Sequence, residues 1–259
     1  MLLKKILFCI LFQLLLLHNF AQTAEVKIHY LGHSAFLLLF DDESSVLCDY
    51  GDENAWAENG WNSPIYDIGN LQPTVITYSH LHEDHFAPRR INSQNSFIYI
   101  GDSAQIGKLS MRSIPTSEDD LSKRSNNSIL FSYKGITILH LGDCQANIFY
   151  IESLNNQKYL KQSFPKGCDI MLIPIENKYQ FIKEAEKFVD LLQPKIVIPM
   201  HYWHQDYKRQ FLHYMDTITN SGTPKYNVEE FDGAQFKYPL KNRNSRTTVV
   251  NVKPAPYRQ

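Results

Sequence analysis

Three histidines and an aspartate lie close together in the stretch Thr77-Tyr78-Ser79-His80-Leu81-His82-Glu83-Asp84-His85-Phe86, with the spacing His-x-His-x-Asp-His. Residues 74–78 are β-branched or aromatic, which predicts a buried strand leading into this stretch. Because side chains two residues apart on a strand point the same way, His80 and His82 can bind one metal ion. A helical turn after the strand would bring Asp84 and His85 to a second position nearby. Imidazole and carboxylate together suit Zn, Fe or Mn better than Ca or Mg, and a metal-free surface loop is the alternative.

Four other segments resemble, in the same order, parts of one known family. They are residues 30–36, an opening strand and turn; 46–49, a strand ending on Asp49; 138–143, a strand ending on Asp143; and 196–202, a strand followed by His201. Together with the histidine motif, they resemble the metallo-β-lactamase-fold hydrolases. The most similar branch is the single-domain one that includes lactonases for sugar phosphates and N-acyl-phosphatidylethanolamine phospholipase D. The resemblance extends over residues 26–203 and is specific for fold and metal binding, less so for substrate.

The order of strand-like and helix-like segments predicts a mixed α+β (α/β) fold without internal repeats. Strands are expected at residues 26–30, 34–40, 46–48, 75–78, 97–100, 129–133, 136–141 and 170–175. Helices are expected at residues 183–192, which have apolar residues at helical spacing before Pro194, and at residues 207–218. Residues 51–72 read as irregular. The resemblance implies two sheets inside a four-layer αββα sandwich, with ligands gathered along one edge.

The first 24 residues predict a secretory signal peptide. Lys4 and Lys5 precede an apolar run of twelve residues, Ile6 to Leu17, and small or polar residues follow up to Ala24. Because a membrane span takes about 20 residues, this run is short for one. We therefore expect cleavage near residues 21–24 and export to the periplasm or the medium, with an uncleaved anchor as the alternative. Residues 25–240 would form one hydrolase domain and residues 241–259 a loose polar tail.

Charge and cysteine content exclude some classes of protein. The 259-residue chain has a formal net charge of −1, which becomes −3 once the two lysines of the signal segment are removed. This charge does not suggest nucleic acid as a partner, in contrast to the RNA-processing nucleases of the same fold. The mature chain keeps Cys48, Cys144 and Cys168, an odd number that allows at most one disulfide. The expected partner is a small-molecule substrate, with no stable membrane insertion after signal cleavage.

The resemblance implies two metal positions that share one bridging carboxylate. Asp84, His85 and His201 would hold one metal, His80 and His82 the other, and Asp143 would bridge them. Glycine at position 142 lets the backbone come close, and a carboxylate can span two ions about 3.5–4 Å apart. The position held by Asp84, His85 and His201 has a complete set of protein ligands.

The position of His80 and His82 lacks the third histidine that family members carry before the bridging aspartate. No histidine lies between Phe86 and Leu139. One interpretation is a weak site of His80, His82, Asp143 and water. In another, an oxygen of Glu118, Asp119 or Asp120 replaces the missing nitrogen, which favours a harder ion. In a third, the site is mononuclear, or degenerate and inactive. We therefore expect Zn²⁺, or Mn or Fe, with one ion bound tightly and a second weaker or absent.

Several residues near these ligands are expected to support them without binding metal. Asp49 would orient a ligand histidine through its free ring nitrogen, with capping of backbone amides as the alternative. His140 lies three positions before Asp143, an odd offset that points the two side chains to opposite faces of a strand. His33, which resembles the family's turn histidine, is expected to be structural. Cys144 is expected to be a small buried hydrophobe.

This set of ligands predicts metal-assisted hydrolysis. A divalent cation lowers the pKa of bound water to about 7, so a metal-bound hydroxide can attack an ester, lactone or phosphodiester. Asp84 is expected to lie nearest this water and to accept its proton. No Gly-x-Ser-x-Gly motif or other covalent nucleophile with a base is visible in the sequence. The alternative function is a degenerate, catalytically weak or inactive metal-binding protein on the same fold, because one ligand histidine is missing.

Aromatic side chains near these ligands are candidate substrate contacts. Trp56 and Trp61 lie in the irregular segment, and Tyr202 and Trp203 directly follow His201. Aromatic rings in both places would line a pocket for an acyl chain or a sugar ring. Covering of the core is the alternative role.

Overall fold

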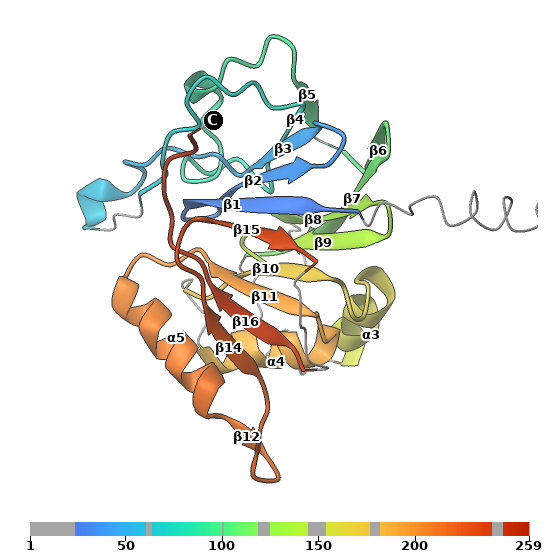
Figure 1. Ribbon diagram of the computed structural model, residues 1–259, viewed down its shortest axis with the longest axis vertical. Coiled ribbons are helices and arrows are strands. Elements are labelled where there is room, and N and C mark those ends of the chain that lie inside the picture. The colour runs from blue at the N-terminus through green and yellow to red at the C-terminus, as the bar shows by residue number, and fades with distance from the viewer. Residues whose placement is uncertain are drawn as a thin grey trace, which may run out of the picture.

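Two β-sheets pack face to face, and helices cover the outer face of the second sheet in this computed structural model (Figure 1). The structure describes residues 24–60, 64–99, 101–118, 125–144, 154–176, 182–239 and 246–258. The signal segment predicted up to residue 24 therefore lies almost entirely outside the described residues, as do Trp61, Asp119 and Asp120.

The first sheet has six strands in the order β15-β1-β2-β3-β4-β5. They are β1 (Val26–Gly32), β2 (Ala35–Phe40), β3 (Ser45–Cys48), β4 (Val75–Thr77), β5 (Phe97–Tyr99) and β15 (Gln235–Tyr238). The strands β1, β2 and β3 form an antiparallel meander, whereas β3, β4 and β5 run parallel. The parallel pairing sets the end of β3, which leads into Asp49, beside the end of β4, which leads into the histidine motif.

The second sheet has eight strands in the order β14-β16-β11-β10-β9-β8-β7-β6. They are β6 (Ser103–Ile106), β7 (Leu109–Thr116), β8 (Asn126–Tyr133), β9 (Ile136–His140), β10 (Ile170–Pro174), β11 (Ile196–Met200), β14 (Asn227–Glu230) and β16 (Thr248–Asn251). The central strands β9, β10 and β11 are parallel, so their carboxyl ends lie at one edge. A separate hairpin joins β12 (Thr219–Asn220) and β13 (Thr223–Pro224).

Three α-helices belong to the second sheet's side of the molecule: α3 (Leu154–Ser163), α4 (Ile182–Leu192) and α5 (Gln205–Thr217). The apolar residues at helical spacing in α4, such as Phe188 and Val189, are buried, as their spacing predicts. None of the helices in the described residues combines the length and the apolar composition needed to cross a membrane.

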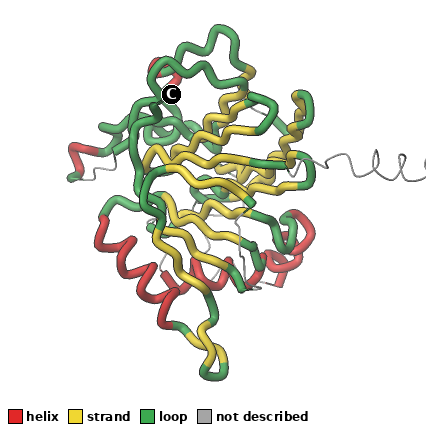
Figure 2. Tube along the Cα trace, viewed as in Figure 1, coloured by secondary structure: helices red, strands yellow, loops and turns green. Residues whose placement is uncertain are grey.

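Loops cover the outer face of the first sheet (Figure 2). Leu31, Leu37 and Leu47 point to this face and pack with Ile65 and Ile68 of the irregular segment. That segment contains the short 3₁₀ helix η1 (Ala57–Asn59), and η2 (Pro88–Arg90) follows the histidine motif. The sandwich is therefore confirmed in its two inner sheets. In the described residues, its predicted outer helical layer on this side is replaced by loop, because these residues lack a helical apolar period.

The prediction of a loose tail from Lys241 onward is wrong for residues 248–251. Residues Thr248–Asn251 form β16, an inner strand that pairs in parallel with β14 on one side and β11 on the other. Thr248, Val249 and Val250 are buried there. Their β-branched run is the sequence signal for this strand. All three cysteines of the described residues, Cys48, Cys144 and Cys168, are buried free thiols.

Candidate metal centre

Strand ends from both sheets bring the candidate ligands to one place. His33 lies in the turn between β1 and β2, the histidine motif follows β4, Asp143 follows β9, and His201 directly follows β11. Apart from His33, these positions lie beyond the carboxyl ends of parallel strands, where open α/β sheets bind their ligands. Glu118 reaches the same place from the end of β7.

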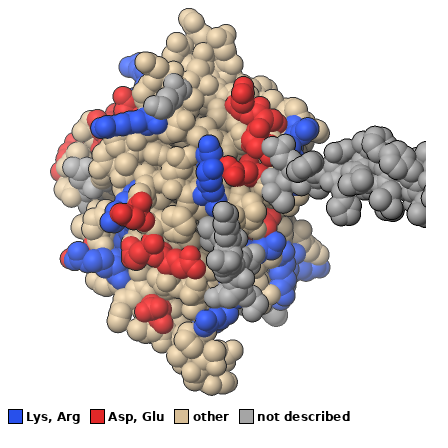
Figure 3. Space-filling model, viewed as in Figure 1, with Lys and Arg blue, Asp and Glu red and all other residues tan. Residues whose placement is uncertain are grey.

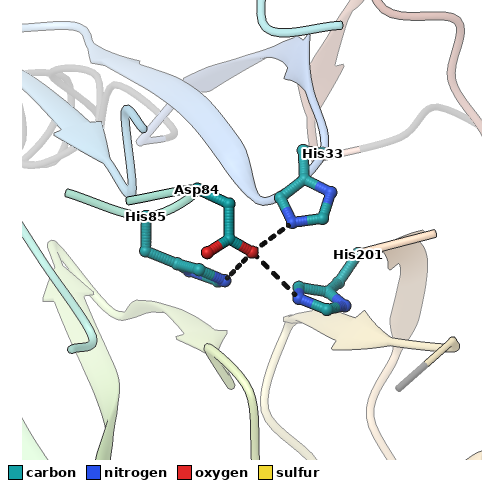
Figure 4. A group of neighbouring side chains, drawn as sticks. All are labelled: His33, Asp84, His85 and His201. Carbon is teal, nitrogen blue, oxygen red and sulfur yellow. Dashed lines mark hydrogen bonds and ion pairs between the residues drawn. The ribbon is translucent and has the colours of Figure 1, made fainter. Parts of the chain in front are cut away.

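The first ligand group consists of His33, Asp84, His85 and His201, whose ligand atoms all lie within 4.8 Å of one another (Figure 4). The Asp84 Oδ2 atom lies 3.0 Å from His33 Nε2, 3.5 Å from His85 Nε2 and 3.7 Å from His201 Nε2. All four side chains are buried. Three of the four are the residues that the resemblance implies for one metal position, and His33 is an addition to them.

The second ligand group consists of His80, His82, Glu118 and Asp143. Glu118 Oε1 lies 3.6 Å from His80 Nε2, and Glu118 Oε2 lies 3.5 Å from His82 Nδ1. Asp143 Oδ2 lies 3.6 Å from His80 Nε2. This group is open to solvent at one side, since the His82 side chain is 53% exposed. Of the three acidic residues considered for the missing histidine, Glu118 is the one in the described residues, and it lies against both histidines.

Asp143 faces both ligand groups with different oxygens. Its Oδ1 atom lies 2.9 Å from His201 Nε2 and 3.1 Å from His85 Nε2, while Oδ2 faces His80. The preceding Gly142 has a φ of +58°, and a Cβ there would lie 2.4 Å from Asn126 Oδ1. Only glycine fits this left-handed, crowded position. The geometry is that of a carboxylate able to bridge two cations.

Hydrogen bonds hold three of the imidazoles so that their Nε2 atoms face the centre. The Nδ1 atom of His85 donates to Asp49 Oδ2 at 2.7 Å, and that of His201 donates to the Glu176 carbonyl oxygen at 2.8 Å. His80 Nδ1 lies 2.9 Å from Ser79 Oγ, whose own hydroxyl donates to Asp49 Oδ2 at 2.6 Å. Fixing Nδ1 in this way selects the tautomer and leaves Nε2 for a metal. Asp49 therefore lies against a candidate ligand histidine, as expected for an orienting residue.

Burial and neighbouring carboxylates shift the pKa values of the four histidines in opposite directions. Burial lowers the pKa of His85 and of His201, but Asp143 and Asp84 outweigh it, so both pKa values rise, that of His201 to about 10. At His33 and His80 burial prevails and lowers each pKa to about 4. The protons of His85 and His201 must leave before their Nε2 atoms can bind a metal.

Several buried ligand-type atoms make no well-aligned hydrogen bond with the described residues, and those of Asp143, His85 and His201 contact one another only as ion pairs. The full set is Nε2 of His80, His85 and His201, Oδ1 of Asp84 and Oδ1 of Asp143. Buried polar atoms in proteins almost always have a partner, and imidazole nitrogens with carboxylate oxygens are ligands of Zn and similar ions. The residues at this site therefore fit a divalent metal.

The two histidines discussed as supporting residues differ in their positions. His140 lies outside both ligand groups: its Nε2 atom is 2.9 Å from the Ser34 carbonyl oxygen, and its Nδ1 accepts from Gly142 N at 3.1 Å. His33, expected to be structural, instead contacts Asp84 within the first ligand group. Its place in the tight turn between β1 and β2, where its φ is +48°, sets its side chain over the centre. A histidine directly after the turn glycine is the sequence signal for it.

The aromatic residues that were predicted to contact substrate differ in their surroundings. Trp56 is 40% exposed, and its ring centroid lies 6.4 Å from that of His82. Trp203 packs against the His33 ring, with centroids 4.4 Å apart. Tyr202 is only 2% exposed and belongs to the hydrophobic core, so the prediction that it contacts substrate is corrected to a core role.

Comparison with known proteins gives one family. Residues 27–201 match the Lactamase_B_3 family, described as the β-lactamase superfamily domain. A UPF0173 metal-dependent hydrolase from Staphylothermus marinus is 30% identical over 203 residues, which cover 68% of this chain and 82% of the relative. A UPF0173 metal-dependent hydrolase from Methanosarcina mazei is 28% identical over 219 residues, with coverages of 72% and 87%.

Solved structures share the fold. A Thermotoga maritima protein of the metallo-β-lactamase superfamily superimposes with a TM-score of 0.59 at 21% identity, covering 88% of this chain and all of that one. Igni18, a metallo hydrolase from Ignicoccus hospitalis, gives a TM-score of 0.54 at 18% identity, covering 84% of this chain and 100% of its own. At these identities, the likeness concerns the fold alone.

Proposed function

This chain is a metal-dependent hydrolase of the β-lactamase superfamily, and we propose that its two ligand groups form a metal centre with two metal positions. The proposed reaction is hydrolysis of an ester, lactone or phosphodiester bond in a small molecule. The observation that carries the proposal is the convergence of buried ligand atoms that make no well-aligned hydrogen bond with the described residues, around an Asp143 carboxylate that faces both groups.

The proposed metal is Zn²⁺ in the first ligand group, because three imidazoles and one carboxylate are the ligands that zinc prefers. When bound, a divalent cation lowers the pKa of water at the site to about 7 and stabilises the negative charge that develops on attack. Glu118 supports a second position, since a carboxylate lies where the family resemblance implies a histidine. This favours the interpretation in which an oxygen replaces the missing nitrogen, over a site that has lost its function.

Asp84 is proposed to hold the attacking water. Its Oδ2 atom lies 3.0 Å from His33 Nε2 within the first ligand group. Its Oδ1 atom is buried and has no hydrogen-bond partner among the described residues. The pKa of Asp84 lies well below its ordinary value: burial would raise it, but the neighbouring His85, His201 and His33 outweigh burial. The low pKa keeps the carboxylate ionised and makes it a weak base, so at rest Oδ1 can hold the attacking water by accepting its hydrogen bond.

Substrate would approach from the side of the second ligand group. The first group is buried, whereas His82 opens onto a pocket that is also lined by Asn54, Trp56, Glu58, Leu81 and Glu83. Trp56 offers an aromatic surface at this entrance. The lining holds carboxylates and no lysine or arginine, and acidic and basic residues are interspersed over the face drawn in Figure 3. Both features argue for a small-molecule substrate rather than nucleic acid.

Export remains part of the proposal and rests on Lys4, Lys5 and the apolar run that follows them. The mature chain is expected to begin between Gln22 and Glu25. The intact mass of protein purified from its native cells tests this expectation. A mass that includes Met1 to Phe20 would favour a membrane anchor instead.

Metal content and hydrolysis of a panel of chromogenic esters, lactones and phosphodiesters test the proposed centre. We expect His201→Ala to lose both the metal of the first group and hydrolysis. The matched control is His213→Ala, which removes an exposed histidine of α5 that belongs to neither ligand group. A His201→Ala protein that keeps wild-type metal content and rate would overturn the proposal.

A further inference from the structure

The two ligand groups differ in their donor atoms. The first group offers three imidazoles and the Asp84 carboxylate, and the second offers two imidazoles and the Glu118 carboxylate, while Asp143 faces both groups. Imidazole suits zinc, whereas carboxylate also suits harder ions such as Mn²⁺. The groups also differ in access, since the first is buried and the second includes the half-exposed His82. Both differences point to unlike cations at the two positions.

The spacing of the second group is that of a coordination shell. Glu118 presents one oxygen to each histidine, at 3.6 Å from His80 Nε2 and 3.5 Å from His82 Nδ1. A contact of 3.6 Å between such atoms is too long for a hydrogen bond. Ligand atoms about 2.0–2.2 Å from a shared tetrahedral ion lie about 3.3–3.6 Å from one another. His80 Nε2 is buried and lacks a hydrogen-bond partner among the described residues, so it is available to such an ion.

One side chain fixes the two carboxylates relative to each other. Asn126 Nδ2 donates to Thr116 Oγ1 at 2.6 Å, two residues before Glu118. Asn126 Oδ1 accepts from Asp143 N at 3.0 Å. The end of β7 and the loop after β9 are therefore tied together through Asn126. Glu118 and Asp143 each lie 3.6 Å from His80 Nε2.

We propose that Glu118 is a metal ligand that makes the second group an exchangeable site for a hard divalent cation, Mn²⁺ or Fe²⁺, beside a retained Zn²⁺. The inference rests on the proposed function only in requiring that the first group holds a metal. Affinity at any site still follows the general order in which Mn²⁺ binds more weakly than Zn²⁺. The expected effect of Glu118 is therefore that the Zn²⁺ and Mn²⁺ affinities differ less at the second group than at the first.

The test uses protein stripped of metal and reloaded with one equivalent of Zn²⁺. Binding of Mn²⁺ is then followed by electron paramagnetic resonance, which counts free Mn²⁺ directly. We expect about one Mn²⁺ site per chain, and at least about tenfold weaker Mn²⁺ binding in Glu118→Gln, because loss of a ligand should cost no less than loss of a residue that orients one. In Glu118→His, Mn²⁺ binding should weaken while Zn²⁺ binding at the second position strengthens.

Controls separate the possible results. Glu53→Gln removes an exposed carboxylate of the same irregular segment as Trp56, paired only with Arg90 in the contacts described, and should bind Mn²⁺ as wild type does. Retention of the single Zn²⁺ by Glu118→Gln shows that this variant is folded. Unchanged Mn²⁺ binding in Glu118→Gln with Zn²⁺ retained would overturn this inference and leave the proposed function standing. Failure of the wild type to hold any Zn²⁺ would overturn both.

Discussion

Asp49→Asn tests whether the protein selects the ligand tautomer of His85. Asp49 Oδ1 accepts from Ser79 N at 2.7 Å, while Oδ2 accepts from Ser79 Oγ at 2.6 Å and from His85 Nδ1 at 2.7 Å. Both oxygens thus receive donors, so an amide nitrogen at either position meets an N–H. If the nitrogen takes the Oδ2 position, His85 must accept through Nδ1 and carry its proton on Nε2, where a metal would bind.

The expected effect of Asp49→Asn is weaker metal binding at the first ligand group by about 10–100-fold, the usual result of losing a residue that orients a ligand. This corresponds to about 1.4–2.7 kcal/mol. Competition with a chromophoric chelator measures the dissociation constant. Asp169→Asn is the matched control, because Asp169 is a buried carboxylate paired with Lys195, away from the centre. It should lower the free energy of unfolding and leave metal affinity unchanged.

A wild-type dissociation constant in Asp49→Asn would refute this account of the tautomer. An equally large loss of metal affinity in Asp169→Asn would also refute it, because the affinity losses of both variants would then reflect a general loss of stability. The comparison is informative because both residues are buried and hydrogen-bonded, and only Asp49 contacts a candidate ligand histidine.

Three further predictions concern protons and packing. Asp143 and Asp84 raise the pKa values of His85 and His201, so loading the first group should release protons and metal affinity should rise with pH. Calorimetry in buffers of different ionisation heat counts the protons released, and no release would contradict the assignment. Burial lowers the pKa of Lys208 from 10.5 to about 8, so the unfolded chain binds its proton more tightly and stability should rise between these pH values, by at most about 3 kcal/mol. Lys208→Met should remove this slope in denaturant titrations, and a persisting slope would count against Lys208 as its source. Gly142→Ala should destabilise the fold by more than about 1 kcal/mol and weaken metal binding, because its Cβ would clash with Asn126. Gly107→Ala, at a similar φ of +57° in open space, should leave metal binding intact. Equal metal affinity in the two variants would contradict the clash.

Local geometry explains which parts of the site the sequence predicts. The side chains of His80 and His82 share a direction because they are two residues apart after a strand, and this follows from backbone geometry alone. His140 lies outside both groups, as expected, but strand alternation does not explain this, because β9 ends at His140 and Asp143 follows in a turn. The pairing of Asp49 with His85 was expected only as a contact with some ligand histidine, since the partner depends on how β3 lies beside β4.

Tertiary arrangement decides the parts that the sequence does not predict. Glu118 was one of three neighbouring acids, and its contact with His80 and His82 depends on the Asn126 link between two loops. His33 joins the first group only because the turn between β1 and β2 folds over Asp84. His33 stands alone in the sequence, so no spacing to other ligand residues identifies it as a member of this group.

The same division holds for the fold. The apolar periods predict α4 and most strands to within a few residues, because burial on one face follows directly from the pattern. The inner strand β16 was missed because its short β-branched run follows a polar stretch. The resemblance implied helices outside both sheets, whereas the sequence marked residues 51–72 as irregular. There, Ile65 and Ile68 cover the sheet without any helical period.

Anomalous diffraction from crystals loaded with Zn²⁺ and then with Mn²⁺ tests the central claim most directly, because it locates and distinguishes both ions. The account predicts a strong zinc peak among His33, Asp84, His85 and His201, on the side that faces Asp143 Oδ1. It predicts a second, more exchangeable peak among His80, His82, Glu118 and Asp143 Oδ2 that carries manganese. Ions bound away from these side chains, or a second ion that Glu118 does not contact, would contradict it.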